Sequence, residues 1–312
     1  MSKQFPIIEV PANALDEAET ETLGTKYKFW FKHPELGRCL YKRTSIHCSN
    51  EDWSEKIASE LCQLLRLPHA HYELAIWDTQ RGTVSPSFLP ESSTLTLGNE
   101  ILAEMIPNYP QSQYRNLSQH TIDAVFRAIR DNDVSPPPTI EYPIGIETAI
   151  DTFLGYLLLD AWIGNGDRHH ENWAFIKKIQ IKDSKPTSIV YLAPTYDHAS
   201  SLGRELLDSK REQKLHNRTV SAYIDKCRSA LYASPEDKKP IKTFEVFATA
   251  ARCYPKGALV WLDCLSKISA DDISELFERV PPDIISAIAI KFAEEILNLN
   301  KIRLCKLQEE LT

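Results

Sequence analysis

The sequence predicts an α+β fold with two lobes, a small β-rich lobe followed by a larger, mainly helical one. Strand-like runs rich in aromatic and β-branched residues are concentrated in the first 90 residues. After PNYPQ at residues 107–111, apolar residues recur mostly at helical spacing. With 312 residues, of which 43% are hydrophobic and 25% charged, the chain can bury one large core or two lobes that share a cleft.

The charge and hydropathy of the chain argue against nucleic acid and membranes as partners. A net charge of -7 and a pI near 5.8 provide no broad basic surface for a phosphate backbone. The longest apolar runs are far shorter than the roughly 20 residues of a membrane span, and the N-terminal residues lack the pattern of a signal peptide. We therefore expect a cytoplasmic protein, or one delivered to another cell by a route without such a signal.

The cysteines favour a reduced protein. Seven of them are scattered along the chain without any C-x-x-C spacing. This argues against a disulfide framework and against a structural zinc site.

The first lobe is predicted at residues 23–106, after a lead-in segment at residues 1–22 that shows no clear period. KYKFWFK and CLYKRT read as two strands around the turn residues HPELGR, which predicts a β-hairpin. A helix should follow, since Trp53, Ile57 and Leu61 fall at helical spacing. Ser49 with Asp52 resembles its capping box. HYELAIWD and RGTVSPSFL then predict two more strands.

The second lobe is predicted at residues 107–312. The apolar run AIDTFLGYLLLDAWI forms one broad helical face, and Gly164 is suited to ending that helix. WAFIKKI and SIVYLAPTY predict two strands joined by a polar turn, with Asp197 directly after the second. The proline-rich stretch at residues 133–143 is expected to be a loop between helices.

Polar residues with the spacing of a phosphotransfer site follow the predicted apolar helix, in GNGDRHHENW. Phosphoryl transfer needs a carboxylate that accepts the proton of the attacking hydroxyl, and oxygen ligands that hold magnesium ions. In protein kinases four residues separate the catalytic base from a metal-binding asparagine, as between Asp167 and Asn172 here. Asp197 lies where the second metal carboxylate is expected. A lone D-x-x-x-x-N is usually a solvated turn, so the prediction rests on the combination.

The same chemistry predicts a lysine on a first-lobe strand, paired with a glutamate on a helix, to anchor the α- and β-phosphates. Lys42 in CLYKRT and Glu55 in EDWSEKIASEL fit by position. Taken singly, Lys42 would be a surface lysine and Glu55 one more exposed helix charge.

The histidines near these carboxylates also suggest a metal-site interpretation, because imidazole is a common transition-metal ligand. Adjacent residues rarely bind one ion together, however. We expect His169 to be structural within the loop, with His170 and His198 facing solvent or touching substrate. Arg168 either orients the loop or binds a phosphate, or it forms a structural ion pair.

The combined pattern resembles the HipA-like serine/threonine kinases. GNGDRHHENW is similar to their catalytic loop, N-x-D-R-H-x-x-N followed by Trp or Phe, and PTYDHASSLG is similar to their metal-binding segment. GTKYKFWF, LYKR and the following helix occur in the order of that family's phosphate loop, anchoring lysine and N-lobe helix. The resemblance covers roughly residues 23–300, including a helical tail like that of the compact single-domain bacterial members.

This resemblance implies a two-lobed protein-kinase-like fold and an ATP- and Mg²⁺-dependent kinase that acts on serine or threonine of a protein substrate, and often on itself. It implies catalytic roles for Asp167, Lys42 and Glu55, and metal binding by Asn172 and Asp197. The implied nucleotide-binding residues are Gly24, Thr25, Lys26 and Lys28 in the phosphate loop, Lys42, the hinge candidates Phe88 and Leu89, and His169. As ordinary core residues, Phe88 and Leu89 would have no such role.

Departures from the family limit what carries over. Only about 22 residues precede the phosphate loop, too few for the antitoxin-binding subdomain of the full-length toxins, so toxin function is not implied. The loop itself contains one glycine. Autophosphorylation is expected at Thr22 or Thr25, or in the segment that follows Asp197. No substrate or regulator is identified by these residues.

Two other functions remain compatible with the motif. Phosphoinositide kinases also have a D-R-H-x-x-N loop, but the acidic chain gives no sign of the basic surface that anionic membranes require. A kinase-like binding protein without turnover would be expected to lack one catalytic position. Here Asp167, Asn172 and Asp197 are all present, together with Lys42.

Overall fold

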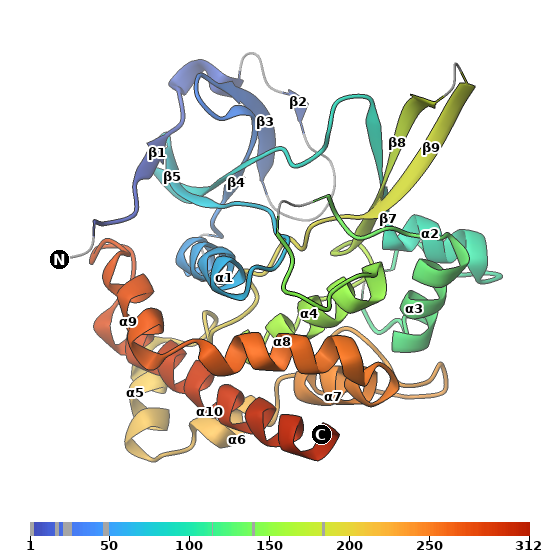
Figure 1. Cartoon of the computed structure of the whole chain (residues 1–312). Helices are drawn as coiled ribbons and strands as arrows, with labels where there is room; N and C mark the ends of the chain where they lie inside the picture. Colours follow the sequence, from blue (N-terminus) through green and yellow to red (C-terminus); the bar gives the residue numbers. More distant parts are fainter. Residues whose placement is uncertain are drawn as a thin grey trace.

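The computed structural model describes residues 3–15, 19–20, 27–45, 50–113, 115–138, 141–182 and 185–312. Within these ranges the chain forms two parts (Figure 1), one built on a mixed sheet and the other largely helical. The predicted α+β class with a β-rich first lobe and a helical second lobe is confirmed. None of the helices in the described ranges has both the length and the apolar character needed to span a membrane.

The first part is a six-stranded sheet with one helix against it. Its strands are β1 (Ile7–Glu9), β2 (Glu19–Thr20), β3 (Lys28–His33), β4 (Gly37–Arg43), β5 (Glu73–Trp77) and β6 (Gln80–Pro86), in the order β1-β5-β6-β4-β3-β2. A short 3-10 helix, Ala12–Leu15, follows β1. Helix α1 (Glu51–Leu65) lies below the sheet in Figure 1 and contacts β5 and β6. The predicted hairpin is the antiparallel pair β3–β4.

Alternating aromatic residues of this sheet form a small core of their own. The ring centroids of Phe29 and Tyr41 lie 5.3 Å apart, and those of Phe29 and Trp77 lie 5.1 Å apart. Because side chains alternate between the faces of a strand, these inward positions leave Lys42 pointing to the opposite face from Tyr41. The lysine therefore faces α1 and the second lobe.

The N-terminal residues, expected to be a lead-in, belong to this sheet. β1 pairs in parallel with β5, with Ile8 opposite Ala75. Phe5 is buried, its backbone N–H donates to the carbonyl of Arg279, and the Arg279 guanidinium lies 4.1 Å from its ring centroid. A strand of three residues has too little periodicity to be recognised before its partner strand is known.

The second part contains a three-stranded antiparallel sheet and most of the helices. The strands are β7 (Ser93–Leu97), β8 (Ala174–Lys182) and β9 (Lys185–Leu192). The helices are α2 (Gly98–Met105), α3 (Ile122–Asp131), α4 (Ala149–Ile163), α5 (Asp208–His216), α6 (Val220–Ile224), α7 (Thr243–Cys253), α8 (Pro255–Lys267), α9 (Ala270–Glu278) and α10 (Ala287–Leu311). β7 pairs with β8, so the chain passes from one sheet to the other between Pro86 and Ser93.

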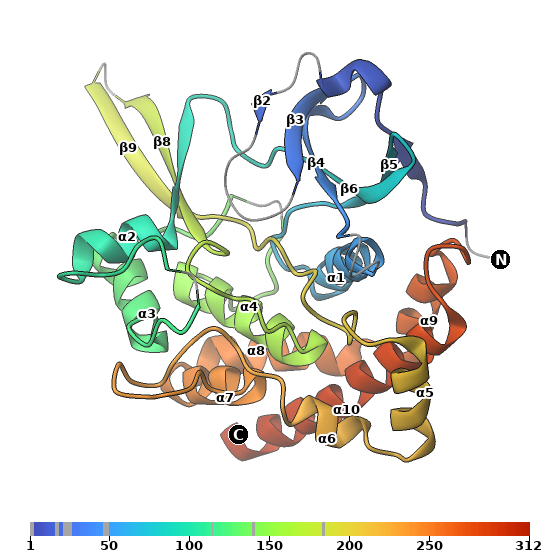
Figure 2. The same cartoon turned by 180° about the vertical axis from the view of Figure 1, so that it is seen from behind.

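Helix α4 is the centre of the larger core. Nearly all its residues are buried, and it contacts α7, α8 and α10 (Figure 2). Thr148 and Asp151 form a capping box at its start, and Gly164 ends it in the left-handed conformation at φ 69°. The predicted end at Gly164 is confirmed, and it fixes where the polar loop begins.

The start of α1 differs from the prediction. Ser49 lies outside the described residues, and Asn50 occupies the N-cap position. The carboxylate of Asp52 is bound by the guanidinium of Arg81 at 2.7 and 3.0 Å. The Asp52 carboxylate, which the predicted capping box would have used, is therefore engaged in an ion pair with Arg81.

Candidate active site between the lobes

The loop after α4 is held by a buried acidic side chain within that helix. Asp160 accepts hydrogen bonds from Nε and Nη2 of Arg168, both at 2.8 Å, and from Nδ2 of Asn165 at 2.8 Å. The Arg168 and Asp160 side chains are almost completely buried. Burial favours a neutral Arg168, but the charge and hydrogen bonds of Asp160 outweigh this effect and raise the Arg168 pKa further. Arg168 thus forms the structural ion pair that was one of its expected roles, and its contact with the loop shows that it also orients that loop.

Arg168 and Asn165 transmit this anchoring to the residues of the predicted chemistry. The Nη1 group of Arg168 donates to the carbonyl of Asn172 at 2.8 Å, and Asn165 accepts from the backbone N–H of Asp167 at 3.1 Å. Asn172 closes the loop by donating through Nδ2 to the Asp167 carbonyl at 2.7 Å. The interval of four residues thus brings Asp167 and Asn172 to one side of a single hydrogen-bonded turn.

Lys42 and Asp197, 155 positions apart in the chain, meet across the two parts of the molecule. Nζ of Lys42 lies 2.5 Å from Oδ1 of Asp197. Burial by itself would lower the Lys42 pKa, but the charges of Asp197 and then of Glu55 outweigh it and raise the pKa to about 12. Lys42 therefore remains a cation at neutral pH.

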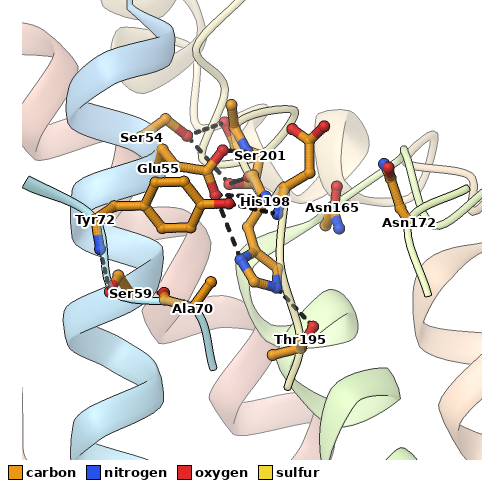
Figure 3. Close-up of polar contacts among 12 residues, drawn as sticks. Ser54, Glu55, Ser59, Ala70, Tyr72, Asn165, Asn172, Thr195, His198 and Ser201 are labelled. Carbon is orange, nitrogen blue, oxygen red and sulfur yellow. Dashed lines mark hydrogen bonds and ion pairs between the residues drawn. The ribbon is translucent and has the colours of Figure 1, made fainter. Parts of the chain in front are cut away.

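Glu55 was expected to pair with Lys42, but its carboxylate binds backbone groups instead. Its carboxylate accepts from the backbone N–H groups of His198 at 2.6 Å and Ala199 at 3.1 Å (Figure 3). Among the described residues, the ion-pair partner of Lys42 is Asp197 and not Glu55. Glu55 is buried and holds the backbone that immediately follows Asp197. Glu55 thus holds Asp197 through the backbone that follows it, whereas Lys42 contacts the Asp197 side chain.

More side chains of α1, which the sequence patterns did not single out, bind the same segment. The hydroxyls of Ser54 and Ser201 are 3.1 Å apart (Figure 3), and Nδ2 of Asn50 donates to the Arg204 carbonyl at 2.9 Å. Nη1 of Arg204 lies 2.7 Å from Oε1 of Glu51. The sequence does show that the start of this helix is unusually polar. It does not show which segment these polar side chains would bind.

The segment after β9 is also joined to the connection between α1 and β5. Thr195 donates through its N–H to the Pro68 carbonyl at 3.0 Å and accepts from the N–H of Ala70 at 2.9 Å. The backbone N–H of Asp197 donates to the Tyr72 hydroxyl at 3.2 Å. Asp197 itself has a left-handed backbone with φ 57°. Such a conformation is uncommon for aspartate, and these contacts on both sides impose it.

The expected exposure of His170 and His198 is wrong, because both side chains are completely buried. Nε2 of His198 lies 2.7 Å from the Thr195 hydroxyl, and Nδ1 of His170 lies 2.9 Å from the Tyr109 hydroxyl. Their polar neighbours are contributed by distant segments, so the sequence around the histidines could not reveal their burial. His169 is half-buried, its Nδ1 accepts from the Glu171 N–H at 3.2 Å, and its Nε2 lies 4.0 Å from Asp167.

A third buried histidine supports the loop from behind. Nε2 of His120 accepts from the Trp173 indole N–H at 3.1 Å, so its Nδ1 carries the proton and donates to the Ala230 carbonyl at 3.2 Å. Burial, and then the charge of the neighbouring His170, lower the His120 pKa to about 3. Burial likewise lowers the His170 pKa to about 4. Both rings are therefore neutral packing elements at pH 7.

Of the remaining candidates for the nucleotide site, the structure describes Lys28, Phe88 and Leu89. Gly24, Thr25 and Lys26, together with Thr22, lie outside the described residues. Lys28 is opposite Lys42 in the β3–β4 register. Phe88 and Leu89 lie in the crossing between β6 and β7, where the Phe88 ring stacks on Tyr196 with centroids 5.8 Å apart.

The fold of this chain also occurs in solved structures. The Helicobacter pylori proinflammatory kinase CtkA superposes with a TM-score of 0.71 at 18% identity, over 94% of this chain and 95% of CtkA. This chain has the HipA-like kinase fold. HipA of the Shewanella oneidensis MR-1 toxin–antitoxin system, solved with HipB and operator DNA, superposes with a TM-score of 0.53 at 14% identity. That match covers 93% of this chain but 64% of HipA, which is less than two thirds.

At these identities the likeness establishes the HipA-like fold and leaves activity to be argued from the site. No protein-family model matches the chain, and no curated protein is similar to it in sequence. The resemblance noted in the sequence is therefore confirmed at the level of the fold.

Proposed function

We propose that this chain is an ATP- and Mg²⁺-dependent protein serine/threonine kinase that also phosphorylates itself. The observation that supports the proposal most strongly is the meeting of Lys42, Asp197, Asn172 and Asp167 where the two lobes join. Lys42 contacts Asp197, Asn172 is bonded to Asp167, and the Gly166 N–H donates to the Ser200 carbonyl at 3.2 Å, which joins the two segments. The HipA-like fold is consistent with this chemistry.

The side chains suit ATP and magnesium. Asp197 and the amide oxygen of Asn172 are the hard oxygen ligands that Mg²⁺ prefers, with Lys42 placed to contact phosphate oxygens. In the described ranges no group of three or more His, Cys, Asp and Glu side chains forms a metal cage. Mg²⁺ is usually held by one or two carboxylates plus substrate phosphates, and Asp197 would supply one such carboxylate. When bound, the ions would neutralise charge on the transferring phosphate.

In this proposal Asp167 is the catalytic base. The acceptor oxygen forms a bond to the γ-phosphorus, the bond from that phosphorus to the ADP leaving group breaks, and the hydroxyl proton passes to Asp167. Asn165, Arg168 and Asp160 hold the base in place through the contacts described above. Glu55 and Lys42 position Asp197.

Incubation of the purified chain with Mg-ATP, followed by intact-mass measurement, tests the proposal. We expect phosphate to be added to the wild type and not to Asp167→Asn. A wild type that gains no phosphate would contradict the proposed autophosphorylation. If it also failed to bind Mg-ATP in a titration, the kinase proposal itself would be wrong.

A further inference from the structure

A hollow of about 280 Å³ opens directly beside Asp167. Its walls are the glycine-containing loop after α4, the segment from Ser200 to Glu205, and helix α6 with Tyr223. The volume is just below the range typical of pockets for whole small ligands and is enough for one or two side chains. The hollow is therefore suited to part of a larger acceptor.

We propose that this hollow is the acceptor pocket, and that it binds a protein segment in which lysine or arginine lies next to the phosphorylated serine or threonine. The inference rests on the proposed kinase function and adds the class of substrate. It assigns recognition of the basic neighbour to Glu205 and Tyr223.

On this wall a hydroxyl of the chain itself already faces the proposed base. Oγ of Ser200 donates to Oδ2 of Asp167 at 3.4 Å, and Nη2 of Arg204 lies 3.3 Å from the same Oγ. An acceptor hydroxyl entering the hollow would reach Asp167 from the same side. A hydroxyl bound in this pocket would thus lie next to Asp167.

Gly164 and Gly166 line the hollow on the side of the loop after α4. A Cβ atom at Gly166 would lie 3.1 Å from the Arg228 carbonyl, and one at Gly164 would lie 3.6 Å from Sγ of Cys227. Gly164 also needs its left-handed backbone at φ 69°. A side chain at Gly166 would therefore press on the backbone at Arg228, whereas at Gly164 the left-handed backbone is the constraint.

The charged side chains that line the hollow are Asp167, Arg204 and Glu205. Arg204 is paired with Glu51 at 2.7 Å, which offsets its positive charge. Glu205 is exposed, and its Oε1 accepts from the Tyr223 hydroxyl at 2.7 Å, which orients the carboxylate at the rim. Burial, and then the charge of Glu205, raise the Cys227 pKa to about 11, so this thiol adds no charge. With Asp167, the lining is acidic and favours a cationic neighbour.

Two synthetic peptides that differ only in the residues flanking one serine, basic in the first and acidic in the second, test this inference. Transfer of phosphate from Mg-ATP to each peptide is measured by mass at low ionic strength, for the wild type and for Glu205→Lys. Glu275→Lys is the matched control, because Glu275 is also exposed and lies on α9. Mg-ATP binding is measured separately for every variant.

We expect the wild type and Glu275→Lys to modify the basic peptide about fivefold faster, the size expected for one partly exposed ion pair. Glu205→Lys should lose or reverse this preference, and Tyr223→Phe should weaken it. An unchanged preference in Glu205→Lys overturns the inference and leaves the kinase proposal intact. Transfer to neither peptide by a chain that binds Mg-ATP also overturns it. A wild type that neither binds Mg-ATP nor transfers phosphate overturns both.

Discussion

The carboxylate of Glu55 binds the backbone N–H of His198, the residue after Asp197, at a distance of 2.6 Å. A second bond to the Ala199 N–H makes the helix side chain a clamp for the segment that follows Asp197. In this structure helix α1 therefore controls Asp197 through the backbone, while Lys42 contacts the Asp197 side chain directly.

Removing the Glu55 clamp should impair the reaction without removing a reacting group. For Glu55→Ala we expect kcat/KM to fall roughly 10- to 100-fold, because hydrogen bonds to a charged group contribute about 1.5–3 kcal/mol. Glu55→Gln keeps one acceptor oxygen and should lose less. Steady-state kinetics with varied ATP would check this order, and an equal loss in both variants would argue against a positioning role.

Substitution of Asp167 and substitution of Asp197 should impair the reaction in different ways. Asp167→Asn should abolish phosphate transfer while leaving Mg-ATP binding largely intact, because the base contacts the acceptor. Asp197→Asn should weaken metal-dependent ATP binding as well. Calorimetric titration of ATP with and without magnesium separates them. If both variants lose binding equally, the roles are assigned wrongly.

The buried ion pair beneath the loop should matter for stability. For Asp160→Ala we expect a loss of about 3–5 kcal/mol in the free energy of unfolding, because the Arg168 guanidinium is then left buried without its counter-charge. Urea unfolding followed by circular dichroism measures this. As a surface comparison, Asp263→Ala removes the exposed pair with Lys267 and should change stability by less than about 1 kcal/mol.

Acid should destabilise the fold partly through its buried histidines. The folded-state pKa values of His120 and His170, about 3 and about 4, are below the ordinary value of 6.5, so below pH 6.5 the unfolded chain binds more protons than the folded one. Stability should therefore fall by about 1.4 kcal/mol per histidine for each pH unit well below 6.5. The loss should level off only near the folded pKa values.

Glutamine does not take up a proton in this pH range, so His120→Gln shows how much of the loss of stability in acid comes from His120. Urea midpoints at pH 7 and pH 5 should differ less for His120→Gln than for the wild type. His216 on α5 is exposed, and His216→Gln should leave the difference unchanged. Identical pH dependence in wild type and His120→Gln would exclude His120 as a source of acid sensitivity.

Local signals in the sequence were sufficient for the main elements near the site. The β3–β4 hairpin, α1, α4 with its end at Gly164, and the β8–β9 pair were predicted because strand alternation, helical spacing and a C-terminal glycine act over a few residues. β1 was not predicted, because a strand of 3 residues is too short to show a period. β7 was not predicted either, although it has 5 residues, as many as the predicted strand β5.

The amino-acid pattern alone indicates that the polar stretch from Asp167 to Asn172 follows a buried helix, and that a kinase-like set of side chains exists in the chain. Which of these side chains meet depends on the folded structure. Lys42 binds Asp197 while Glu55 binds the backbone beside it, and His170 and His198 are buried. Such pairings join residues more than 140 positions apart, and their energy depends on distance and burial in the folded chain, which no spacing along the sequence encodes.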